Sequence, residues 1–255
     1  MHLARRILVV AAFAAALLLP AVAPAQGKFP PDSFTNLKVL PKNIDQRTLI
    51  NTMRGFAMGL GVRCTYCHVA PHDDAPLDSV AFAKDDKRTK RVARVMMHMV
   101  MHINSEHLQE VPERPKPLLE VRCATCHRGV ARPRLLDDDM TLTLADSGLD
   151  AAVRRYRDLR QRYYGSGSYD FREGVLIEVA RGEARAGRPD NAIGLLNLNA
   201  EFNPQSAATP AALGDTYLAK GDTATAIANY RTALSRDSTF GPARFRLRQL
   251  TGGRP

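Results

Sequence analysis

Apolar residues recur at helical spacing early in the chain, ahead of a glycine-containing turn. The spacing predicts a helix from about Asp45, a favourable N-cap residue, to Leu60. Gly59 and Gly61 act as its stop signals. The residues on its apolar face are Leu49, Met53, Phe56 and Leu60. Met53 therefore points inward, whereas Met58 is rotated away by more than a quarter turn.

A second helix, expected from about Lys87 to His107, is rich in methionine and histidine. One face of this helix consists of Val92, Met96, Met99 and Ile103. The positions that point elsewhere include Met97, His98 and Met101. Most of these methionines must be packing residues, because only one of them can be a ligand of a single metal site.

The C-terminal third is helical from Leu149 and repeats with a period of 34 over residues 173–240. The second copy carries residues at positions typical of tetratricopeptide repeats, namely Leu213, Gly214, Tyr217, Ala226, Tyr230 and Ala233. The first copy is degenerate, with Glu183 where an aromatic residue usually stands, and Pro204 ends it. Residues 242–250 predict a capping helix. This resemblance implies protein binding, and a spacer or stabilising cap is the alternative.

The N-terminus has the pattern of a secretory signal peptide over residues 1–25. A basic start precedes an apolar run over residues 7–19, and the small residues at 23–25 offer a cleavage site before Gln26. A membrane span needs about 20 apolar residues, so the short run favours cleavage over an uncleaved anchor. We therefore expect a periplasmic or secreted protein, with the uncleaved membrane anchor as the alternative.

The chain is basic, with a formal charge of +10 on 255 residues. In an exported protein this charge favours an acidic partner surface or an anionic membrane face over nucleic acid. A merely soluble surface is the other interpretation. All four cysteines fall in two Cys-x-x-Cys-His motifs, which leaves none for a structural disulfide, a thiol nucleophile or a cysteine-rich zinc site.

Both motifs have the spacing of c-type haem attachment sites. Two intervening residues place both thiols along one turn of backbone, where they can bond the two vinyl groups of one porphyrin. The adjacent imidazole then lies under the iron. A thioredoxin-like redox motif needs no such histidine, and a zinc site would not place one directly after both pairs. We predict two covalently bound haem c groups, held by Cys64 and Cys67 and by Cys123 and Cys126, with proximal ligands His68 and His127.

Each motif follows a helix that offers methionine as a distal iron ligand. Met53 is the candidate for the first haem, because the following turn lets helix and motif close on opposite faces of one porphyrin. A core methionine that fills an irregular gap is the alternative. For the second haem, Met96 or Met99 is the better candidate by geometry. His98 or His102 would instead give bis-histidine ligation and a lower reduction potential.

The motifs and the helices before them share a wider pattern. It comprises Thr52-Met53, Leu60–His68, Ala93–Val100, Ile103-Asn104 and Cys123–Gly129. Over about residues 33–135, this pattern resembles the haem units of the photosynthetic reaction-centre cytochrome c subunit family. In that family each unit is a helix with the axial methionine, a turn and Cys-x-x-Cys-His. The resemblance implies Met53 as distal ligand of the first haem and favours Met96 for the second.

The chain departs from that family in two respects. It has two attachment motifs, whereas the family's reaction-centre subunits typically carry four haems. Glu110 stands near the place where the family has a histidine for a further haem. The resemblance therefore implies the haem-binding unit, and not a reaction-centre partner.

The expected fold class is mainly α, a small dihaem c-type cytochrome domain of helix–turn–motif units followed by a short tetratricopeptide-type repeat domain. Arg132-Pro133 and the acidic stretch 136–139 are interpreted as a linker. The expected domains are therefore a signal peptide at 1–25, a cytochrome domain at 26–138 and a repeat domain at 139–255.

The leading functional hypothesis is an exported dihaem electron carrier, and not an enzyme, that docks a partner through its repeats. Its expected partners are redox proteins, including a membrane-bound redox complex. A dihaem peroxidase-like enzyme is the main rival, but it needs an iron that can open a site for peroxide, and methionine ligation argues against one. A haem-containing assembly factor or sensor is the third alternative.

Overall fold

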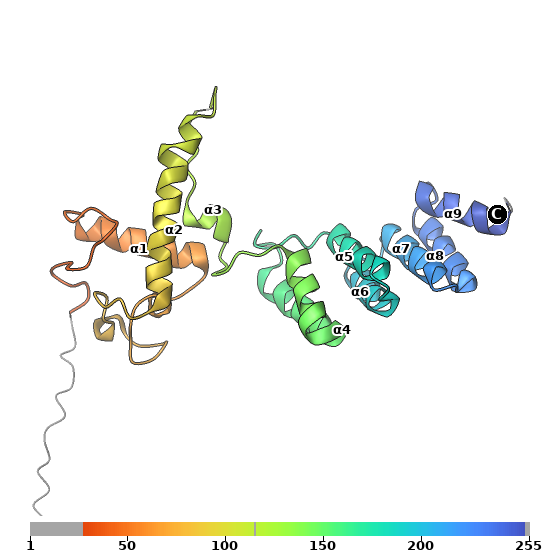
Figure 1. Ribbon diagram of the computed structural model, residues 1–255, viewed down its shortest axis with the longest axis horizontal. Helices are drawn as coiled ribbons and strands as arrows, with labels where there is room; N and C mark the ends of the chain where they lie inside the picture. Colours follow the sequence, from red (N-terminus) through yellow and green to blue (C-terminus); the bar gives the residue numbers. More distant parts are fainter. Residues whose placement is uncertain (1–27, 115, 253–255) are drawn as a thin grey trace, which may run out of the picture.

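The computed structural model describes residues 28–114 and 116–252, so the signal peptide expected at 1–25 lies outside the described residues. The described residues form helices and loops, with one isolated antiparallel bridge between Val69 and Ala81 and no strand beyond it. The expected mainly α fold class is confirmed. None of the helices in these ranges is long and apolar enough to cross a membrane. Figure 1 shows the helices around the two motifs at one end of the long axis and the C-terminal helices at the other.

The first helix, α1 (Gln46–Leu60), has the bounds that its apolar spacing predicts. The Asp45 carboxylate accepts a hydrogen bond from a first-turn backbone N–H at 2.9 Å, which makes it the N-cap. Gly61 ends the helix in the left-handed region, with φ 64°. Met53 is half-buried, whereas Met58 is 74 % exposed. The predicted orientation of α1 is confirmed.

The second long helix, α2 (Arg88–Ser105), has polar residues buried on one side and part of its apolar face exposed on the other. Lys90 is only 8 % exposed and Arg94 is half-buried, while Val92 and Met99 on the opposite side are 41 % and 42 % exposed. The reason is that both cations reach polar groups of the preceding loop, which fixes the rotation of the helix. Short elements complete the N-terminal half, namely η1 (Cys64–Tyr66), η2 (Leu77–Ser79), η3 (His107–Gln109) and α3 (Cys123–His127).

The C-terminal half is a row of paired helices. They are α4 (Leu136–Tyr163), α5 (Glu173–Arg185), α6 (Pro189–Phe202), α7 (Ala208–Ala219), α8 (Thr223–Arg236) and α9 (Gly241–Thr251). α5 packs on α6 and α7 on α8, while α4 covers the first pair and α9 the last (Figure 1). A Cβ at Gly214 would lie 2.6 Å from the Tyr230 ring, so glycine permits the close approach of α7 and α8. Each copy of the 34-residue repeat thus corresponds to one helix pair, the first to α5 and α6 and the second to α7 and α8. The expected capping helix is α9.

The acidic stretch 136–139 is the first turn of α4, so its interpretation as a linker is wrong. Its aspartates lie where carboxylates oppose the helix dipole favourably, and the next residue, Met140, is fully buried. Gly148, with φ 81°, interrupts α4 directly before the helix expected from residue 149. The expected boundary between residues 138 and 139 falls inside α4. The division into two domains stays a prediction, and a boundary before residue 136 would leave this helix whole.

Both hydrophobic cores of the described residues lie in the C-terminal half, one built on α4–α7 and the other on α7–α9. Among the described residues before α4, the buried apolar side chains are Leu49, Ala75 and Val80. Large apolar side chains of that half are exposed instead, namely Met58, Leu77, Val92, Val95, Met99, Met101, Val111, Leu118 and Leu119. The N-terminal half therefore has apolar surface for a large apolar body but little protein core of its own.

Candidate haem sites

The first motif, residues 64–68, lies directly after the turn that ends α1 and begins with η1. The His68 backbone N–H donates to the Cys64 carbonyl at 3.0 Å, which keeps the motif in a single tight turn. The start of α2 also fixes the motif, through two hydrogen bonds. Lys87 Nζ and Thr89 Oγ1 each donate to a backbone carbonyl of the motif. Elements on both sides of it in the sequence therefore fix its position.

The second motif is α3, and α2 fixes the chain that leads into it. The side-chain amide of Asn104 donates to the Val121 carbonyl and accepts from the Val121 N–H, both at 2.8 Å. These two bonds pair an amide side chain with a backbone segment as a neighbouring strand would. The end of α2 therefore determines where Cys123 and the rest of α3 begin.

The last turn of α1 contacts the second motif. The Gly129 N–H, just after α3, donates to the Gly59 carbonyl at 2.9 Å. A Cβ at Gly59 would lie 3.1 Å from the Ala124 nitrogen, and a Cβ at Gly61 would lie 2.0 Å from the Gly129 oxygen. Only glycine allows this approach at position 61, where φ is also positive. The end of α1, which leads into the first motif, therefore packs against the second motif.

Both motif histidines have one ring nitrogen bonded to a backbone carbonyl. His68 Nδ1 lies 3.2 Å from the Phe82 oxygen, and His127 Nδ1 lies 2.9 Å from the Val130 oxygen. A carbonyl can only accept, so each Nδ1 carries the proton and each Nε2 keeps its lone pair. This is the tautomer and the outer hydrogen bond that a metal-ligating imidazole requires.

The environment of His68 also keeps its imidazole neutral. Its ring packs edge-on against Phe82, with centroids 4.9 Å apart and an interplanar angle of 61°. Burial and, after it, the charge of Lys90 lower the pKa of His68 to about 4. A neutral imidazole is the form that binds a metal ion.

The cysteines and the apolar surface fit haem as well. Cys64, Cys67 and Cys123 are half-buried and Cys126 is exposed. Burial raises the pKa of the Cys67 and Cys123 thiols. The exposed methionines, valines and leucines of the same half offer the apolar contacts that a porphyrin needs. The residues present therefore suit two haem c groups.

The candidate distal ligands lie on α1 and α2, and they differ in burial. Met53 on α1 and Met96 on α2 are both half-buried, and Met99 is exposed. His98 is exposed, and His102 Nδ1 lies 2.9 Å from the Glu106 carboxylate on the solvent side of α2. The choice among these ligands stays a prediction.

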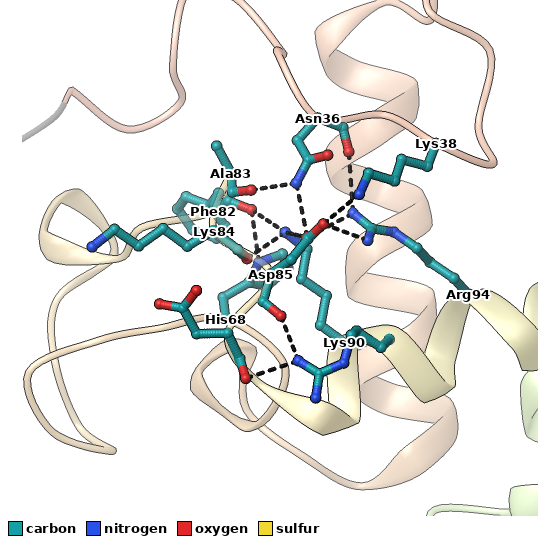
Figure 2. A network of polar contacts seen from close by, with 11 residues as sticks. Asn36, Lys38, His68, Phe82, Ala83, Lys84, Asp85, Lys90 and Arg94 are labelled. Carbon is teal, nitrogen blue, oxygen red and sulfur yellow. Dashed lines mark hydrogen bonds and ion pairs between the residues drawn. The ribbon is translucent and has the colours of Figure 1, made fainter.

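A polar network next to the first motif escaped the sequence reasoning. Asp85 accepts hydrogen bonds from Arg94 at 2.8 Å, Lys38 at 2.7 Å and Asn36 at 2.8 Å, as Figure 2 shows. Hydrogen bonds from Arg94, Lys38 and then Lys90 hold the pKa of Asp85 well below its usual range. A run of mixed charges normally indicates a solvated loop. Only the two acidic residues at 85–86, directly before the basic start of α2, hinted at a pairing.

Comparison with known proteins gives one family. A family model described as photosynthetic reaction centre cytochrome C subunit matches residues 8–141. This span includes α1, α2 and both motifs and ends in the first turns of α4. Among curated proteins, none matches the chain.

Proposed function

Because the chain belongs to the photosynthetic reaction centre cytochrome c subunit family, we propose that it is an exported dihaem carrier that passes electrons between redox proteins. Family membership makes it a c-type cytochrome and suggests electron transfer with partners in membrane complexes. The number of haems, the export and the docking role of α4–α9 are the parts of this proposal that go beyond family membership. Helix pairs of this kind present an extended surface to other proteins, which supports docking.

One observation carries the proposal, namely that both motif histidines donate Nδ1–H to a backbone carbonyl. Nε2 of His68 and of His127 would then be the proximal ligand. The thiols of Cys64 and Cys67 would hold one haem by thioether bonds, and those of Cys123 and Cys126 the other. When bound, haem supplies a reversible one-electron iron couple.

Two helices would complete the coordination, with Met53 on α1 for the first haem and Met96 on α2 for the second. Met99 remains the alternative to Met96. Thioether ligation on both irons would leave no open position for peroxide, which supports a carrier over an enzyme. The surrounding protein would then orient the ligands and exclude water, and no residue would act as a catalytic acid or base.

Mass spectrometry of the mature protein, produced in a host with a c-type maturation system, tests the haem number. We expect two haem additions in the wild type and one in Cys67→Ala or Cys126→Ala. His72→Ala, which changes an exposed histidine just after the first motif, is the control and keeps both haems. Fewer than two additions in the wild type would refute the dihaem proposal. A high-spin ferric spectrum would favour an enzyme or a sensor instead.

A further inference from the structure

Lys90 is a buried cation beside the first motif, and all its donors are used. Its Nζ donates to the Phe82 and Lys84 carbonyls, both at 2.7 Å, and lies 3.0 Å from an Asp85 carboxylate oxygen (Figure 2). An ammonium group has three donors, so these partners satisfy it completely. A buried charge is tolerated only under this condition. The positive charge of Lys90 is therefore held at one place.

The Phe82 carbonyl connects this charge to the proximal histidine. It accepts from Lys90 Nζ at 2.7 Å and also faces His68 Nδ1 at 3.2 Å. A hydrogen bond from Nδ1–H makes an imidazole a stronger donor to its metal. A carbonyl that already accepts a short bond from a cation accepts the second one more weakly. The ligand strength of His68 is thereby reduced.

We propose that Lys90 is a positioning residue that raises the reduction potential of the first haem through the Phe82 carbonyl, an inference that rests on the proposed function. Weaker donation from His68 disfavours the oxidised iron, and a fixed positive charge nearby disfavours it further. Both effects act in the same direction.

The second motif lacks this arrangement, so the two haems are tuned unequally. His127 bonds the Val130 carbonyl at 2.9 Å, only three residues further along the chain. Within the described residues, no side-chain donor bonds that carbonyl besides His127. Arg128, the cation next to His127 in the sequence, donates instead to the Gly167 carbonyl. We therefore expect the first haem to have a higher reduction potential, and to be reduced more often, than its axial ligands alone would predict.

The negative charge of Asp85 partly offsets the positive charge that acts on the first haem. Lys38, Lys90 and Arg94 surround this single carboxylate, so the group holds three cations and one anion. The removal of the anion therefore increases the local positive charge. The removal of Lys90 decreases it. The two changes should move the potential of the first haem in opposite directions.

A redox titration of the full-length holoprotein tests this proposal, with Lys90→Met as the main variant. One midpoint potential should fall, so that the oxidised-to-reduced ratio of that haem rises about tenfold, roughly 59 mV for a one-electron couple. The other potential should stay unchanged. Lys84→Met is the matched control, since it removes the same charge from an exposed position of the same loop. Equal shifts in both variants, or no shift in Lys90→Met, would overturn the proposal.

Asp85→Asn decides the question if Lys90→Met fails to retain its haem. Here the same potential should rise, which mere loosening of the loop would not produce. A fall, or no change, overturns the proposal. Mass spectrometry separates this inference from the function on which it rests. Fewer than two haems in the wild type contradict the dihaem function, whereas two haems with unshifted potentials contradict the role of Lys90 alone.

Discussion

Gly61 lies where the end of α1 meets the chain just after the second motif, and its replacement by alanine tests that contact. The residue has φ 64°, and a Cβ there would lie 2.0 Å from the Gly129 oxygen. A side chain in the left-handed region costs roughly 1–2 kcal/mol. The clash with a backbone oxygen adds about 1–3 kcal/mol, because the second motif must move away. Gly61→Ala should therefore lower the free energy of unfolding by roughly 2–5 kcal/mol, out of a typical total of about 5–15 kcal/mol.

Two other glycines of the same half separate these contributions. Gly129 has φ 82° but open space around a Cβ, so Gly129→Ala should cost only the backbone contribution of about 1–2 kcal/mol. Gly55 lies inside α1 with nothing within 4 Å, so Gly55→Ala should stabilise the protein by about 0.5–1 kcal/mol.

Denaturant unfolding of the holoprotein, followed by haem absorbance and by circular dichroism, measures all three variants. The expected order of stability is Gly55→Ala, wild type, Gly129→Ala and then Gly61→Ala. If Gly61→Ala were no less stable than Gly129→Ala, the close approach of the end of α1 to the second motif would be refuted.

Two further predictions concern ligation and acid stability. Met53→His should lower one measured potential and leave the other nearly unchanged, while Met58→His, at an exposed position of the same helix, should change neither; the reverse result would contradict the ligand assignment. Glu183 is 4 % exposed and accepts two 2.7 Å hydrogen bonds from Arg188, which together lower its pKa. Its ion pair therefore stabilises the fold above the usual carboxylate pKa and is lost as the pH falls through the lowered value. With Glu183→Gln, the free energy of unfolding of α4–α9 should fall less steeply below about pH 4.5. Glu178→Gln, in an exposed ion pair on the same helix, is the control. Equal pH profiles of Glu183→Gln and the wild type would refute this role.

Elements with local signals could be predicted from the sequence. The bounds of α1 follow from the Asp45 cap, the apolar face and Gly61, all within one short segment. The helix pairs of the C-terminal half follow from a repeat, in which each copy supports the reading of the other. The Cys-x-x-Cys-His motifs are recognised from their spacing alone, and haem attachment at their cysteines stays a prediction.

Features that depend on distant partners could not be predicted. Lys90 is buried because carbonyls of the preceding loop accept from it, and nothing in the spacing of α2 indicates this. Val92 and Met99, on the opposite side of the helix, are exposed. The aspartates at the start of α4 resemble a linker by composition, since helix N-termini and loops favour the same residues.

Each long helix of the N-terminal half leads into one motif and also holds the other. α1 runs into the first motif through Gly61, yet its last turn packs against Ala124 and Gly129 of the second. α2 leads to the second motif through Asn104, yet its start holds the first motif through Lys87 and Thr89. Neither motif is therefore held only by the helix that precedes it, and the loss of either helix removes contacts from both motifs. These shared contacts fix each motif relative to both helices, as the proposed electron transfer between two haems would require.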